Sequence, residues 1–207
     1  MYKCLYAPVS MLFLAAALAL PIPAQCPEMQ KLREYYRQKR FVSLEFLQTT
    51  RSDVFETVDT LQGTVHAGWE GRFRLTMPDQ VLVSNGVLVW SYSAENRQVL
   101  IDSVRELESW NPITLLYDPE RVYTCKAQTK RGDLWELEMT AVDTSIVPRQ
   151  FTLQVTERDY VPKALIYHDD AGSRIEVHID NFSRQDQLPD SLFEFRPGPG
   201  IEVIRMP

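Results

Sequence analysis

The sequence lacks the common motifs of hydrolases and nucleotide-binding enzymes. It contains no Gly-x-Ser-x-Gly nucleophile elbow, and no helical pattern follows Gly198-Pro199-Gly200 to form a phosphate-binding loop. Glu136 and Glu138 alternate with apolar residues, which is typical of the solvent face of a strand rather than of an acid–base pair. We therefore expect a protein that is not an enzyme and uses no cofactor.

Histidine is scarce, and basic charge is not in excess. The chain has three histidines, none of them in a His-x-x-x-His pair. His168, Asp169, Asp170 and His178 fall in one expected hairpin, but solvated histidines beside turn acids fit this spacing better than a metal site does, so we expect no metal. The net charge of −6 argues against a nucleic-acid partner, which would favour a basic face.

No apolar run is long enough to span a membrane. The run at residues 11–20 follows Lys3 and precedes Pro21-Ile22-Pro23-Ala24, which predicts a secretory signal peptide over residues 1–24, cleaved after Ala24. An N-terminal membrane anchor is the alternative. Residues 25–207 then form one domain of ordinary size.

Cysteine is also scarce, with three in the chain. Removing the signal peptide removes Cys4, and the even count that remains in an exported protein favours a disulfide between Cys26 and Cys125. Such a bridge would close a loop of about a hundred residues, worth up to about 4.7 kcal/mol. Two separately buried thiols are the alternative, because the sequence gives no distance between them. Lipidation of Cys26 is disfavoured because Gln25 is not small.

The most distinctive stretch present is residues 81–92, in which two apolar β-type runs flank Asn85-Gly86. An Asn-Gly pair favours a type I′ hairpin turn, because both residues tolerate positive φ. Val81 and Val83 alternate with Leu82, and the second run is also apolar on both sides. The pattern predicts a hairpin in the interior of a sheet.

The remaining chain is mostly strand-like. A helix is expected over residues 27–40, with Met29, Leu32, Tyr35 and Tyr36 as an apolar stripe that packs on the sheet. Two short helices are expected within residues 102–123. About ten or eleven strands, each with one apolar face, must curl so that this face becomes concave. The concave face is then a filled core or a ligand cavity, and the pattern alone favours the filled core.

Several motifs together resemble the periplasmic outer-membrane lipoprotein carrier family, LolA. Over nearly the whole mature chain they are Phe46-Leu-Gln48, Gly71-Arg-Phe-Arg-Leu75, Leu82-Val-Ser-Asn-Gly-Val-Leu-Val-Trp-Ser-Tyr92, Phe151-Thr-Leu153 and Phe193-Glu-Phe-Arg-Pro-Gly-Pro-Gly-Ile201. The Ser-Asn-Gly…Trp-x-Tyr element and the Phe-x-Phe-x-Pro…Gly-Ile ending, in this order behind a signal peptide, are specific together although each is weak alone. The resemblance implies a mainly β (α+β) fold: an unclosed antiparallel β-barrel of about eleven strands with short helices acting as a lid.

The resemblance also implies an apolar cavity for lipoprotein acyl chains. Its expected wall is Val42, Leu44, Phe46, Phe73, Leu75, Trp90, Trp135, Leu137, Phe151 and Leu153, and its expected lid is Trp110, Ile113, Leu115 and Leu116. Ordinary core packing is the alternative for each wall residue. Family members often carry Arg-Pro before the third strand, and the resemblance implies that this arginine latches the lid. Trp69-Glu70 stand at the matching positions here, so either Arg72 or Arg74 takes that role or this lid is held differently.

As a member of this family, the chain would act in the periplasm. It would take lipoproteins from an inner-membrane lipoprotein-releasing transporter, shield their acyl chains, and deliver them as a monomer to an outer-membrane acceptor. The alternatives are a lipid- or lipoprotein-binding sensor of the same fold, or the outer-membrane acceptor itself.

Intact-mass analysis of the exported protein tests the processing site. Cleavage after Ala24 predicts a mature chain that begins at Gln25, lacks Lys3 and Cys4, and carries no lipid. A mass increased by acyl groups on an N-terminal Cys26 would instead indicate an acceptor-type lipoprotein.

Overall fold

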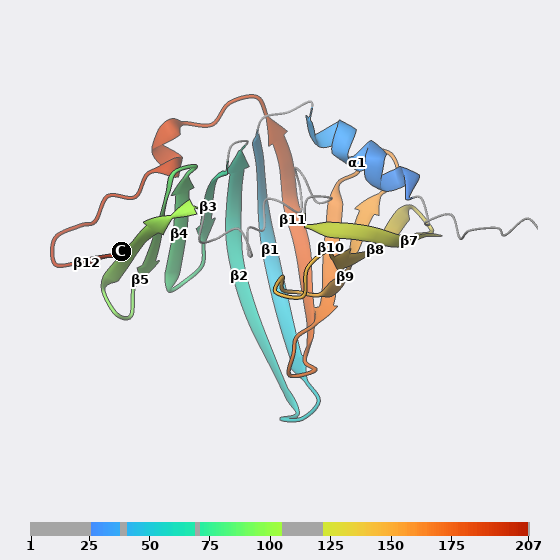
Figure 1. The fold of residues 1–207 in the computed structure, drawn as a ribbon, viewed down its shortest axis with the longest axis horizontal. Helices are drawn as coiled ribbons and strands as arrows, with labels where there is room; N and C mark the ends of the chain where they lie inside the picture. The colour runs from blue at the N-terminus through green and yellow to red at the C-terminus, as the bar shows by residue number, and fades with distance from the viewer. Residues whose placement is uncertain (1–25, 38–40, 69–70, 105–121, 207) are drawn as a thin grey trace, which may run out of the picture.

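The fold is one large β-sheet with a helix packed on it (Figure 1). The computed structural model describes residues 26–37, 41–68, 71–104 and 122–206, so the predicted signal peptide and most of residues 102–123 lie outside the described ranges. The elements are α1 (Pro27–Arg37), β1 (Phe41–Ser52), β2 (Thr57–Gly68), β3 (Arg72–Thr76), β4 (Gln80–Asn85), β5 (Leu88–Ser93), β6 (Gln98–Ser103), β7 (Tyr123–Arg131), β8 (Leu134–Ala141), β9 (Gln150–Thr156), β10 (Pro162–His168), β11 (Arg174–Gln185), the 3-10 helix η3 (Asp190–Phe193) and β12 (Glu202–Arg205).

The twelve strands form an open sheet in the order β12-β6-β5-β4-β3-β2-β1-β11-β10-β9-β8-β7. Two halves of the sheet, of seven and five strands, meet where β1 lies beside β11. Among the described residues, the edge strands β12 and β7 do not pair with each other. This confirms the predicted mainly β, unclosed barrel. The strand beyond the expected eleven is β12, which pairs with β6 in parallel, whereas the other pairs are antiparallel.

The register places apolar side chains of both halves on one face, here called the inner face. Across the centre of the sheet, Phe46 lies opposite Gly63 on β2 and Ile179 on β11. In the second half, Leu153 lies opposite both Leu137 and Leu165. Because side chains alternate along a strand, residues two positions away from these lie on the same face, except where a β-bulge interrupts the alternation.

Helix α1 packs on the inner face, near β7, β8 and β10 (Figure 1). Met29, Leu32 and Tyr36 of its predicted stripe are no more than 2% exposed and join the apolar core of the sheet. The helix begins at Pro27, as predicted. The described helix ends at Arg37, and the last three residues of the predicted helix lie outside the described ranges.

Polar contacts anchor the start of α1. The Glu28 carboxylate accepts hydrogen bonds from Tyr160 Oη at 2.6 Å and from Lys31 Nζ at 2.8 Å, and the Glu28 amide donates to Gln128 Oε1 at 3.1 Å. Burial acts to raise the pKa of Glu28, but these bonds and the charges of Lys31 and Lys130 lower it below its ordinary value overall. The helix therefore carries a charged group that the sheet and the helix itself stabilise.

Cys26 and Cys125 form a disulfide, with 6.1 Å between their Cα atoms. Cys26 precedes α1 and Cys125 lies on β7, so the bridge ties the helix to an edge strand of the sheet. The two cysteines are thus not separate buried thiols.

The Asn85-Gly86 turn differs from the predicted type I′. Ser84 pairs with Val89, so residues 85–88 form a four-residue loop. A type I′ turn would need positive φ at both Asn85 and Gly86, but of these two only Gly86 has it, at 91°. The Asn85 side chain instead shapes the loop, because its Oδ1 accepts hydrogen bonds from the amides of Val87 and Leu88 at 2.9 and 2.8 Å.

The C-terminal segment covers the outer face of β3, β4 and β5. Phe195 stacks on Tyr92 with 5.3 Å between ring centroids, and Phe193 stacks on Phe41 at 5.8 Å. This cover explains why the β4–β5 hairpin is apolar on both faces although it lies third and fourth from the β12 edge rather than at the centre of the sheet. Across the described ranges, no helix combines the length and the apolar character needed to cross a bilayer.

Removing the disulfide tests its contribution to stability. We expect Cys26→Ser with Cys125→Ser to lower the free energy of unfolding by about 2–4 kcal/mol, because the unfolded chain loses a constraint over a loop of 99 residues. Urea unfolding of the mature protein measures the change. Reduced wild type is the matched control and should unfold with the double variant; equal midpoints for oxidised wild type and the variant would refute the expectation.

Candidate functional site: an apolar inner face

Nine of the ten predicted wall residues lie together on the inner face. They belong to a single apolar cluster, in which seven are buried (Val42, Leu44, Phe73, Leu75, Leu137, Phe151 and Leu153) and two are partly exposed (Phe46 and Trp135). The structure thus brings together side chains that are more than a hundred residues apart in sequence. Seven of the nine are core residues, and the two partly exposed ones are those with surface left for a further contact.

Trp90 does not join this cluster. It lies directly opposite Val83 on β4 and Ile101 on β6, and these residues alternate with the inner-face positions of their strands. The register thus places Trp90 on the outer face of the sheet, the face that the C-terminal segment covers. Because β5 is apolar on both sides, alternation does not indicate which side faces the core, and the prediction of Trp90 as a wall residue was wrong for this reason.

Thirteen partly buried hydrophobic residues pack against the buried cluster, and we take six of them as the candidate contact surface. They come from five strands and from the turn after β3: Phe46, Met77, Leu82, Trp135, Leu165 and Ile179. Sequence reasoning identified only Phe46 and Trp135 among them. The alternation of Ile175, Val177 and Ile179 was visible in the sequence, but nothing indicated that it shares a face with Phe46 until β11 was placed beside β1.

Gly63 provides room for Phe46. A Cβ atom at Gly63 would lie 2.7 Å from the Phe46 ring and 2.6 Å from the carbonyl oxygen of Thr76. Both distances are shorter than van der Waals contact, so the ring occupies space that only glycine leaves open. The position of the ring between β11 and β2 therefore depends on this one residue.

Cations on the inner face are held against aromatic rings. The Arg184 guanidinium lies 3.5 Å from the centroid of Tyr35 on α1 and donates to the backbone oxygen and the hydroxyl of Tyr35. Lys130 lies 5.9 Å from the Trp135 ring and also pairs with Glu157. The charges of Arg184 and Lys130 are thus both paired with groups at the border of the apolar surface.

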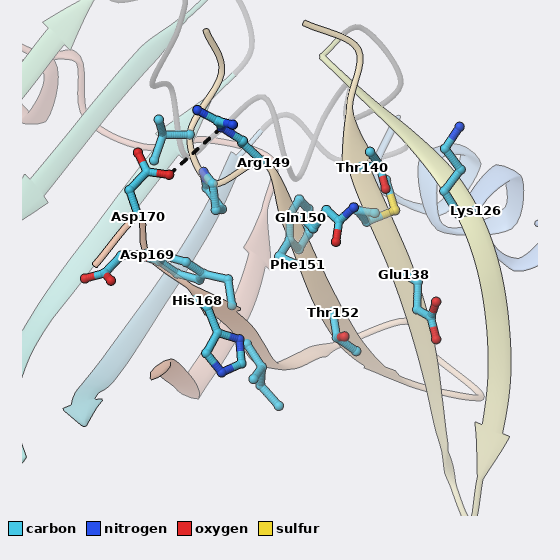
Figure 2. Close-up of a pocket in the computed structure, with 15 residues that line it drawn as sticks. Lys126, Glu138, Thr140, Arg149, Gln150, Phe151, Thr152, His168, Asp169 and Asp170 are labelled. Atoms are coloured by element: carbon cyan, nitrogen blue, oxygen red, sulfur yellow. Dashed lines mark ion pairs between the residues drawn. The ribbon is translucent and has the colours of Figure 1, made fainter. Parts of the chain in front are cut away.

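A hollow of about 620 Å³ lies at the start of β9 and the end of β10 and has a mixed polar and apolar lining (Figure 2). Lys126 and His168 line it together with the ion pair between Arg149 and Asp170, whose charged atoms are 3.9 Å apart. Within the described ranges, no three His, Cys, Asp or Glu side chains gather as a metal site would require. Met139, Phe151 and Ile166 also line this hollow, so its surface is mixed, whereas the candidate contact surface on the inner face is apolar.

Arg72 and Arg74, the two candidates for latching the lid, lie on the outer face of the sheet. Arg72 Nη1 pairs with Asp190 at 3.1 Å, and Arg74 donates to the backbone oxygen of Leu192 at 3.3 Å. Both therefore hold the C-terminal segment on the outer face and do not fasten a cover over the inner face. Trp69-Glu70 and the predicted lid residues Trp110, Ile113, Leu115 and Leu116 lie outside the described residues, and the lid stays a prediction.

Comparison with known proteins identifies relatives of this chain. The family model for the outer membrane lipoprotein carrier protein LolA matches residues 37–196. An outer-membrane lipoprotein carrier protein of Halorhodospira halophila is 26% identical over 202 residues, covering 94% of this chain and 93% of the relative. One from Haemophilus influenzae is 26% identical over 166 residues, covering 78% and 79%. An uncharacterized conserved protein of Thermus thermophilus has a similar fold, with a TM-score of 0.56, 13% identity, and coverage of 86% and 99%.

Gly63→Ala tests the close packing at the centre of the inner face. The added methyl group must displace the Phe46 ring and press on a backbone oxygen, so we expect a loss of about 1–3 kcal/mol in the free energy of unfolding. Gly198→Ala is the control, because its Cβ would meet nothing closer than 3.9 Å. Urea unfolding that gives both variants the same midpoint would show that Phe46 is not confined in this way.

Proposed function

The chain belongs to the LolA family of outer membrane lipoprotein carrier proteins, and from this premise we propose that it carries lipoproteins across the periplasm. In this proposal its inner face shields the acyl chains of a lipoprotein released from the inner membrane, and the protein then delivers the lipoprotein to the outer membrane. Its partners are an inner-membrane lipoprotein-releasing transporter and an outer-membrane acceptor, and it works as a monomer without catalysis.

One observation carries the proposal: an apolar face on which large side chains, including the six contact residues, remain partly exposed in an unclosed sheet. Each methylene of an acyl chain gains about 0.8 kcal/mol on leaving water, so acyl chains need cover between two membranes. Phe46, Met77 and Leu82 offer such cover beside a fully packed core. A filled core alone would leave no partly exposed apolar face for a ligand.

Delivery requires that the acyl chains are bound reversibly. Net affinity is lower than buried area suggests whenever binding must displace existing contacts or order mobile groups. The six contact residues already pack against the core, so an acyl chain adds contacts on one side of each ring or chain only. Helix α1 is fastened by the disulfide and by Glu28, and we therefore assign it to the fixed wall rather than to a moving part.

The outer-membrane acceptor is the weaker alternative for this chain. An acceptor anchored at Cys26 would carry its lipid through the Cys26 sulfur. The same sulfur is bonded to Cys125 in this structure, and one sulfur does not form both bonds. This observation favours a carrier that is free in the periplasm.

A release assay with two neighbouring substitutions tests the proposal. Inner-membrane vesicles that hold lipoproteins and their exporter are incubated with the purified mature protein, and the soluble complex is quantified. We expect Phe46→Asp to lower complex formation tenfold or more, because a carboxylate on the inner face must lose water when acyl chains bind. Leu47→Asp should change it less than about twofold, because Leu47 lies next in sequence but on the exposed outer face.

Circular dichroism confirms that both variants are folded, and Phe46→Gln provides a milder change at the same position. Equal release by the Phe46 and Leu47 variants would contradict the assignment of the inner face. Binding of a fluorescent acyl probe without release of lipoprotein would favour a lipid-binding sensor. Hydrolysis of a lipid ester by the pure protein would contradict the proposal that it is not an enzyme.

A further inference from the structure

Strand β2 has an unpaired stretch within the sheet. It pairs with β1 along its whole length, from Thr57 to Gly68, but with β3 only from Thr64 to Ala67. Among the strands that the structure describes, residues 57–63 therefore have a neighbour on one side only, and Figure 1 shows β2 extending beyond β3. This stretch contains neither proline nor lysine, the residues that commonly protect exposed edges from further pairing.

A groove of about 750 Å³ lies where β3 ends and this edge begins. Its lining includes Gln62 and Gly63 of the edge, Thr76 and Met77 at the end of β3, and Leu47 of β1. An extended chain that pairs with residues 57–63 would run directly into this groove. The edge and the groove thus form one continuous surface, on which backbone pairing and side-chain contacts can act together.

The groove is acidic. Glu45 and Asp180 both line it, and they lie directly opposite each other across the β1–β11 pair. Like charges in this arrangement repel each other. Glu45 accepts a hydrogen bond from Asn181 at 2.7 Å, yet in the described part of the chain no cation pairs with either carboxylate. Asp59 adds a third acid on the edge itself.

We propose that residues 57–63 of β2 bind a basic, extended segment of a partner protein by strand addition. Its backbone pairs with the free edge, and its lysine or arginine side chains reach Glu45 and Asp180. This interaction goes beyond the proposed carrier function, because it is made by the backbone of the β2 edge and by the outer-face acids Glu45 and Asp180. The groove also reaches Phe46 and Met77 of the inner face, so the two surfaces adjoin. A second copy of this chain fits less well, because it would bring the same acids to the edge.

The test uses a synthetic ten-residue peptide in which lysine alternates with valine and threonine, labelled for fluorescence anisotropy. We expect it to bind the full mature protein and to slow amide hydrogen exchange at residues 57–63. Glu45→Gln with Asp180→Asn should weaken binding about three- to tenfold, the size expected for two exposed ion pairs. Glu95→Gln with Asp133→Asn, two exposed acids elsewhere, should leave affinity unchanged.

A second peptide with proline at its centre should bind at least tenfold more weakly, because proline cannot donate to a strand ladder. Equal binding of the proline peptide, equal binding to the Glu45/Asp180 variant, or exchange protection away from β2 would overturn the proposal. So would self-association of the protein through this edge, detected by sedimentation. Acyl-probe binding should be unchanged in the Glu45/Asp180 variant, so failure of this inference and failure of the carrier function are separable.

Discussion

The pairing of β1 with β11 is the interaction on which the rest of the structure depends. It joins the seven-stranded half to the five-stranded half, and the inner face exists only because both halves turn their apolar sides the same way. A β-bulge makes this compatible with the sequence: the register shifts between Ser43 and Glu45, opposite Asn181, which has φ of 47°. The extra residue changes which side chains of β11 face inward.

The bulge lets one strand serve two packing partners. Before it, Ile179 faces inward beside Phe46; after it, Phe182 faces inward and contacts Tyr36 of α1 with 5.9 Å between ring centroids. Without the extra residue, strict alternation would turn one of these two side chains to the outer face. The contact between helix and sheet and the apolar centre of the inner face therefore both rest on a single irregular position.

The sequence predicted the elements better than their assembly. Period-two alternation located the strands around Phe46, Leu75, Leu137 and Leu153, and these side chains do share a face. It failed at Trp90, because β5 is apolar on both sides and the outer cover comes from a distant segment. Nothing local indicates that Phe195 stacks on Tyr92, or that Asn85 shapes its turn with its side chain. The contributions of Leu165 and Ile179 depend on strand order, which alternation does not encode.

The central position of β1 also bears on how the chain reaches its folded state. The first strand cannot complete its pairing until β11 is available, since Glu45 and its hydrogen-bond partner Asn181 are separated by 136 residues. Proteins dominated by such distant pairings fold slowly, because the cost of closing a long loop comes before the contacts that repay it. During this interval the apolar side of β1 is uncovered and open to association with other chains. Folding of this protein is therefore sensitive to chain concentration. If folding stops before β11, which begins at Arg174, is in place, β1 has a paired strand on one side only.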